Sequence, residues 1–274
     1  MFQPQIRHSS RVRSAYELLE RIFHASVRDI RKSSGNAVLG LIMAIVQSIV
    51  MVLIFYVIFV VFGLRGNAIR GDFLLYVMSG VFMFMTHTKA IGAVAGADGP
   101  TSSMMMHAPM NPIVSIAAAA LSSLYIQTLS ASVILLFYHT VFSPITIDQP
   151  VPMMGMFLLS WISGVAIGMV FLSAKPWQPE TVGLIRVIYQ RANMIASGKM
   201  LVANATPANI RSLFDWNPLF HTIDQGRGFI FLNYNPRYTS IEYPIYIALI
   251  CIMIGLMGEF YTRQYASASW GKRR

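Results

Sequence analysis

Residues 37–62, AVLGLIMAIVQSIVMVLIFYVIFVVF, form an apolar run without a charged side chain. A helix needs about 20 mostly apolar residues to cross the hydrocarbon core of a bilayer, so this run is long enough to span a membrane. Inside a bilayer every backbone N–H and C=O must bond within the protein, and a helix achieves this alone. The run therefore predicts an integral membrane protein built from helices.

The overall composition agrees with a membrane environment. Hydrophobic residues make up 55% of the chain and charged residues 12%, against about 25% charged in an ordinary soluble domain. A soluble chain this apolar would carry large apolar patches on its surface. The net charge of +10 does not indicate nucleic-acid binding, because the basic residues gather mainly near the two termini. Basic clusters beside apolar spans are what the positive-inside rule describes.

Five further apolar segments predict an all-α, six-span protein with one transmembrane domain over residues 1–274. The spans are expected at residues 37–62, 73–94, 112–142, 153–174, 181–203 and 244–261. Six spans place both termini on one side, and the terminal Lys and Arg residues predict that this side is the cytoplasm. The expected location is a bacterial inner (cytoplasmic) membrane.

The fifth of these spans is the most polar, since it carries Arg186, Arg191 and Lys199. A charge at the centre of a bilayer costs several kcal/mol, by estimates that disagree. Such side chains are expected to face a bundle interior, a cavity or a partner subunit. The alternative is a helix that starts at the interface and leaves Arg186 and Arg191 outside the hydrocarbon.

Three segments outside the spans have helical patterns of their own. Residues 11–32 repeat apolar side chains at three- and four-residue spacing, with basic residues opposite. This predicts an amphipathic helix in the headgroup plane; a soluble helix packed on a partner is the alternative. Residues 100–109, bracketed by prolines, predict a short cytoplasmic helix. Residues 204–243 predict an outer (periplasmic) helical hairpin, re-entrant or lying in the interface, in which Asn217 caps a helix that begins at Pro218.

The sequence contains no pattern typical of catalysis or metal binding. It has no phosphate-binding loop, no HExxH and no GxSxG. Its single cysteine, Cys251, excludes a disulfide within one chain and a cysteine-based zinc site. We therefore expect no catalytic residues, no metal site and no cofactor on this chain. If the protein moves a substrate, the energy is expected from another chain.

This layout, together with two segments, resembles a known family. Residues 212–231, SLFDWNPLFHTIDQGRGFIF, look like that family's small helix followed by WNP, an acidic residue and an arginine. Residues 18–40 look like its entry into the first span. The chain resembles the membrane subunits of type-2 ABC exporters, within them the permeases for capsular polysaccharide and O-antigen. The family usually has Glu where Asp224 stands.

The resemblance implies a set of partners. They are a second copy of this chain and two copies of a cytoplasmic ABC ATPase, which would hold ATP and Mg²⁺. Periplasmic and outer-membrane export components and membrane lipids complete the expected partners; nucleic acid is not among them. The implied function is a non-enzymatic permease subunit that exports a polysaccharide, expected to be lipid-linked.

The resemblance also implies three groups of site residues. A coupling helix would contact the ATPase through Ser102, Met104, Met105, Met106, His107 and Pro109. A periplasmic gate hairpin would use Trp216, Asn217, Pro218, His221, Asp224 and Arg227. Aromatic side chains that stack on sugar rings would line the substrate path, with Tyr56, Phe59, Tyr76, Phe82, Phe84 and Tyr189 as candidates.

Two other functions stay open at this point. The same exporter class could carry a drug, a lipid or an oligosaccharide. A membrane enzyme or assembly factor without transport is the alternative from another class. Such an enzyme would need clustered polar groups at one membrane face, and the only loose cluster is Arg211, Asp215, His221, Asp224 and Arg227. These residues are interpreted as hairpin capping and gating.

Overall fold

The computed structural model of the chain describes residues 11–34, 36–63, 69, 71–98 and 112–265. The regular secondary structure of these residues is entirely helical. Its elements are α1 Arg11–Ser34, α2 Ala37–Val61, α3 Phe73–Ala95, α5 Pro112–Val141, α6 Pro150–Ala174, α7 Pro179–Ala196, the 3₁₀ turn η2 Ala203–Ala205, α8 Ala208–Arg211, α9 Pro218–Ile230 and α10 Glu242–Tyr265.

Five of the described helices are long and apolar enough to cross a membrane: α2, α3, α5, α6 and α10. These helices match five of the six predicted spans, and the prediction of an all-α integral membrane protein is confirmed. Helix α7 is not among them, because Glu180, Arg186 and Arg191 lie within its Pro179–Ala196 sequence. The predicted 181–203 segment is also not one helix. It leaves the helix after Ala196, and Gly198 adopts a left-handed backbone with φ 69°.

Helix α3 lies at the centre of the bundle. It packs closely against α6, and α6 in turn packs against α10. Two glycines of α6 make the first contact possible. A Cβ at Gly164 would lie 2.4 Å from the carbonyl oxygen of His87, and one at Gly168 would lie 2.9 Å from the Cβ of Val94. Small residues of this kind allow helix backbones to approach within a membrane.

Helix α1 packs across the end of the bundle against α5 and α2. Ile22 and Ala25 face Val114 and Ala118 of α5. The apolar face predicted for this helix points the other way: Tyr16, Leu19 and Phe23 are 63–70% exposed. An exposed apolar stripe on a basic helix is typical of a helix that lies at a membrane surface.

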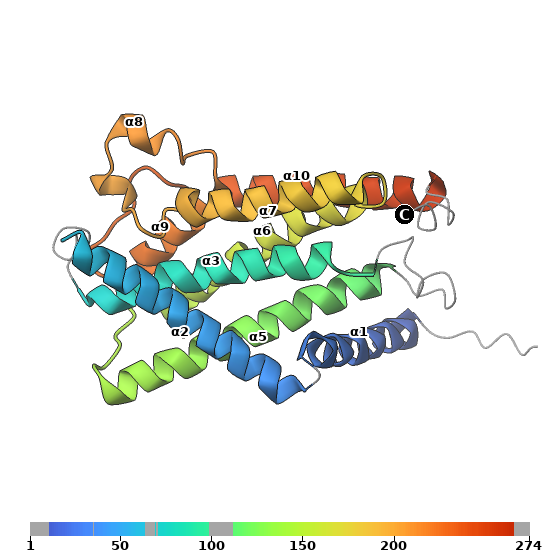
Figure 1. Cartoon of the computed structure of the whole chain (residues 1–274), viewed down its shortest axis with the longest axis horizontal. Helices are drawn as coiled ribbons and strands as arrows, with labels where there is room; N and C mark the ends of the chain where they lie inside the picture. The colour runs from blue at the N-terminus through green and yellow to red at the C-terminus, as the bar shows by residue number, and fades with distance from the viewer. Residues whose placement is uncertain (1–10, 35, 64–68, 70, 99–111, 266–274) are drawn as a thin grey trace, which may run out of the picture.

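The described chain begins and ends at the same end of the bundle. Figure 1 shows α1 and the end of α10 at the same end of the bundle, with the end of α2 and the start of α3 at the opposite end. Helix α7 contacts α6 and runs between the two ends of the bundle. Helices α8 and α9 lie at the end away from α1.

Candidate functional site

The predicted hairpin is built around α9, which packs against α6, α3 and α10. Asn217 caps the helix as predicted: its side chain accepts a hydrogen bond from the backbone N–H of Leu219, and Pro218 occupies the first turn. The Asn217 amide also donates to the Asn193 side chain at 2.7 Å and to the Ala196 carbonyl at 2.8 Å. Asn217 therefore joins the start of α9 to the end of α7.

Asp224 and Arg227 tie α9 to the segments before and after it. The Asp224 carboxylate accepts hydrogen bonds from the hydroxyls of Tyr234 and Thr239 and from the backbone N–H of Ala203. Burial and the neighbouring Asp224 carboxylate raise the pKa of the Tyr234 hydroxyl, so it remains a donor at neutral pH. Arg227 is fully buried and donates to the carbonyls of residues 198, 199 and 201.

The other two gate residues predicted in the hairpin differ in exposure. His221 is buried, with Nε2 2.8 Å from the Asp215 carbonyl oxygen and Nδ1 3.1 Å from the backbone nitrogen of Ser240. Trp216 is 56% exposed and its indole N–H donates to the Leu213 carbonyl. Four of the six predicted residues, Asn217, His221, Asp224 and Arg227, thus each make separate hydrogen bonds that attach α9 to the segments around it.

Helix α9 reaches from one end of the bundle well in between its neighbours α3 and α6. Its Gly226 lies against Met83 of α3 and Met156 of α6. Thr222 lies 3.4 Å from the hydroxyl of Ser160. Met83 and Ser160 each lie ten residues into their helices, which is roughly 15 Å along the helix axis.

The aromatic residues predicted for the substrate path are mostly packed inside the chain. Phe59, Tyr76, Phe82 and Phe84 are at most 7% exposed, whereas Tyr56 and Tyr189 are partly exposed. Tyr76 stacks on Phe73, and Phe59 meets both rings edge-on. The Phe84 ring instead lies 3.5 Å from the amine of Lys199. None of the six lines either of the two cavities described below. The coupling-helix residues Ser102, Met104, Met105, Met106, His107 and Pro109 lie outside the described residues.

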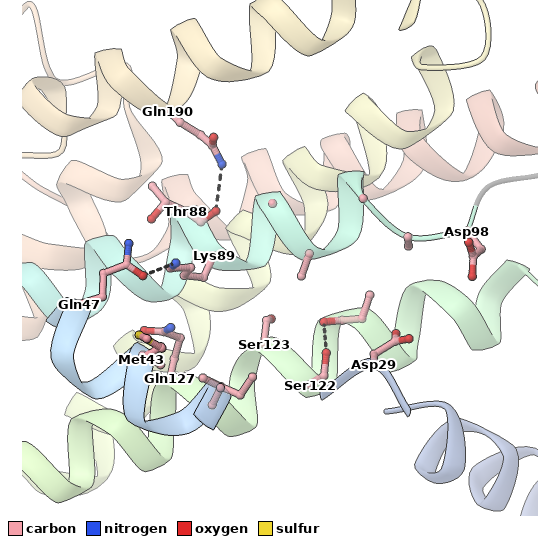
Figure 2. Close-up of a pocket in the computed structure, with 18 residues that line it drawn as sticks. Asp29, Met43, Gln47, Thr88, Lys89, Asp98, Ser122, Ser123, Gln127 and Gln190 are labelled. Carbon is pink, nitrogen blue, oxygen red and sulfur yellow. Dashed lines mark hydrogen bonds between the residues drawn. The ribbon is translucent and has the colours of Figure 1, made fainter. Parts of the chain in front are cut away.

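The larger cavity has a volume of about 660 Å³ and lies at the α1 end of the bundle, between α1, α2, α3 and α5. Its lining is unusually polar for an apolar bundle. Figure 2 shows Lys89 of α3 directed to Gln47 of α2, and their side chains join at 2.6 Å. Gln190 of α7 closes one edge by donating to the Thr88 carbonyl at 3.1 Å. Gln127, Ser122 and Ser123 line the cavity from α5.

The smaller cavity, about 490 Å³, lies at the other end of the bundle. Asp72 lines it and also caps α3. Burial raises the pKa of Asp72, but hydrogen bonds from Tyr138, Ser143 and two backbone amides outweigh burial and hold the pKa below its ordinary value. Among the described residues, no three His, Cys, Asp or Glu side chains come together to hold a metal ion.

The polar cavity was not predicted from the sequence, although a signal for it exists. Gln47, Lys89, Gln127 and Gln190 each lie within a helix of a largely apolar bundle. Taken singly, Lys89 is one charge near the end of an apolar segment. Taken together, an amide or amine on four helices predicts a shared polar surface, since polar side chains within membrane segments face one another or a water-filled cavity.

Comparisons with known proteins find two similar curated proteins. No protein-family model matches the chain. Two curated proteins, both named polysialic acid transport protein KpsM of Escherichia coli, are each 24% identical, over 260 and 263 residues. These matches cover 93% of this chain and 98% of each relative. The chain is related to this transport protein over nearly its full length. The resemblance to membrane subunits of type-2 ABC exporters for capsular polysaccharide is thereby confirmed.

Proposed function

We propose that this chain is the permease subunit of an ATP-driven exporter that moves a polysaccharide across the bacterial inner membrane. The observation that carries the proposal is the match to a polysialic acid transport protein along 93% of this chain. The polar cavity inside an apolar bundle supports it, because a sugar chain needs hydrogen-bonding partners where lipid offers none. ATP and Mg²⁺ are expected on a separate ATPase subunit.

A six-span topology with both termini in the cytoplasm is part of this proposal. The position of α1 and the end of α10 at one end of the bundle supports an even number of crossings. Helix α7 supplies the sixth: its 18 residues are roughly 27 Å long, close to the hydrocarbon thickness of about 30 Å. Its polarity fits a helix that faces protein or a cavity more than one that faces lipid.

The protein is proposed to work as a homodimer. Helix α7 makes few contacts with the rest of its own chain, and it exposes Leu184, Ile188 and the charged Arg191 together. A helix surface that mixes apolar and charged side chains suits neither lipid nor water, which indicates that another protein covers it. The family resemblance implies that this protein is a second copy of the chain. The 100–109 segment is proposed to contact the ATPase.

The outer hairpin is proposed to be re-entrant and to act as a gate. The contact of Gly226 with Met83 and Met156 supports this, since those residues lie well inside α3 and α6. The hydrogen-bond network of Asp224 and Arg227 would let the hairpin move as one body. Three residues of the cluster considered for an enzyme, His221, Asp224 and Arg227, are engaged in structural hydrogen bonds, and this favours gating over catalysis.

Export is the direct test of the proposed function. A strain that lacks this gene is expected to accumulate polysaccharide inside the cell and to lose it from the surface, and the intact gene on a plasmid should restore export. A strain whose surface polysaccharide is unchanged, but which loses resistance to a drug or the export of a lipid, would support the same exporter class with another cargo. Unchanged export of every cargo would contradict the proposal.

A further inference from the structure

The polar cavity at the α1 end contains hydrogen-bond donors that the fold does not use. The Lys89 ammonium donates to the Gln47 side chain at 2.6 Å, which occupies one of its three N–H groups. Within the described residues, Lys89 has no carboxylate in salt-bridge range. Gln47 accepts that bond through its oxygen, so its own NH₂ group remains available.

Gln127 supplies a second unused donor, on the opposite wall of the cavity. Its side chain is 5% exposed and lines the cavity from α5. In the part of the chain that the structure describes, this amide makes no hydrogen bond. The amide is not among the buried side-chain groups that lack a partner, so it is open to the cavity. An open amide donor facing the Lys89 ammonium across a cavity indicates a place suited to a ligand.

The distribution of charge along the cavity indicates the sign of that ligand. Among the described residues that line it, Lys89 is the only basic one, and Asp29 and Asp98 are the only acidic ones. Asp29 has a basic neighbour, since Arg28 lies 3.9 Å from its carboxylate. Asp98 follows the end of α3, roughly 13 Å along the chain axis from Lys89. The part of the cavity farther from α1 therefore offers N–H donors and a positive charge, and the two carboxylates lie in the part nearer α1.

We propose that this cavity binds an oxyanion of the cargo, with Lys89 as the counter-ion and Gln47 and Gln127 as further donors. This inference rests on the proposed export function and specifies its substrate class: an acidic or phosphate-bearing polysaccharide. The carboxylate of an acidic sugar and the phosphate of a lipid anchor share this chemistry. A volume of about 660 Å³ is in the usual range for small-ligand sites, so the cavity would hold one charged unit of a longer chain.

Two soluble probes separate these two sources. The full chain, in a lipid nanodisc with any ATPase that accompanies it, is titrated with oligosialic acid, which has carboxylates and no phosphate. A parallel titration uses dihexanoyl phosphatidic acid, which has a phosphate and no sugar. Kd is measured by thermophoresis for the wild type, Lys89→Gln, Lys89→Arg and Gln127→Leu. The matched control is Lys175→Gln, which removes an exposed lysine beyond the end of α6.

Lys89→Gln is expected to weaken binding of the cognate probe at least about tenfold, or about 1.4 kcal/mol. Gln127→Leu should weaken it less, Lys89→Arg should retain most of it, and Lys175→Gln should leave it unchanged. An effect on oligosialic acid alone assigns the site to an acidic sugar, and an effect on the phosphatidic acid alone assigns it to a lipid anchor. The inference is overturned if the wild type binds neither probe, or if a monodisperse Lys89→Gln protein binds both as well as the wild type does.

The same preparations separate a failure of this inference from a failure of the proposed function. A wild-type chain that carries an ATPase and exports polysaccharide, but whose probe binding ignores Lys89, would refute the oxyanion site alone. A chain that binds a probe through Lys89 but never associates with an ATPase would refute the exporter proposal and leave the site standing.

Discussion

Replacing Arg227 by Met is expected to loosen the outer hairpin more than any other single change in it. The guanidinium is fully buried and donates to the backbone carbonyls of residues 198, 199 and 201. It also lies 4.0 Å from the centroid of the Tyr76 ring. Methionine fills a similar volume but supplies no donor, so the turn after α7 loses its attachment to α9.

The size of the effect follows from the acceptors left behind. The Gly198 carbonyl keeps a hydrogen bond from the N–H of Leu201. The carbonyls of residues 199 and 201 lose the hydrogen bonds that the Arg227 guanidinium donates to them. A buried acceptor without a partner costs about 1–3 kcal/mol, so two such acceptors cost about 2–6 kcal/mol. We expect Arg227→Met to lower the free energy of unfolding by about 2–6 kcal/mol, or Tm by roughly 10 °C.

The assay is thermal unfolding of the purified chain in a mild detergent. Arg237→Met is the matched control, because Arg237 is exposed in the same hairpin and its hydrogen bond to Asn204 comes from the backbone N–H. The control should change stability by less than about 0.5 kcal/mol. Equal Tm values for Arg227→Met and Arg237→Met would refute the structural role given to the buried guanidinium.

Three further predictions follow from the backbone, the charges and the topology. Gly198→Ala should destabilise the chain by more than about 2 kcal/mol, because φ is 69° and a Cβ would lie 2.2 Å from the Phe220 ring. The control is Gly183→Ala in α7, which has open space around it and should be neutral or stabilising. A lower Tm for Gly183→Ala than for Gly198→Ala would contradict this. The lowered pKa of Asp72 means that its carboxylate stabilises the fold at neutral pH and that this contribution is lost as the pH falls through the folded-state pKa. Tm values of the wild type and Asp72→Asn should therefore converge below about pH 4, and a constant gap would refute the assignment. In a Cys251→Ala background, a membrane-impermeant maleimide added to intact cells should label Asp148→Cys and Leu213→Cys. It should label Lys175→Cys only after lysis. If Leu213→Cys is also labelled only after lysis, α7 does not cross the membrane.

The sequence predicted best the features that depend on one segment at a time. The charge-free run 37–62 matches α2 to within a residue of Ala37–Val61, because length and hydropathy alone decide a membrane helix. The start of α9 was equally predictable, since an Asn followed by Pro carries its own capping chemistry. The end of α7 was not predictable in this way. Its apolar pattern continues to residue 203, but tertiary contacts of the turn after Ala196 with Arg227 replace helical hydrogen bonds.

The polar cavity depends on side chains that come together only in the fold. Gln47, Lys89 and Gln127 are separated by some 40 residues each along the chain, and each sits alone in an apolar helix. Predicting that they share one cavity requires the packing of α2, α3 and α5. The aromatic residues illustrate the converse, since Phe59 and Phe84 have the composition of a sugar-binding path but are buried inside the chain. Their use as a path between two copies stays a prediction.

Affinity purification of the tagged chain from its own membranes, followed by mass determination of the intact complex, tests the exporter account most directly. The account predicts two copies of this chain together with two copies of an ABC ATPase. A lone chain, or a complex without any nucleotide-binding subunit, would leave the helical membrane fold intact and contradict its assignment as the permease of an ATP-driven exporter.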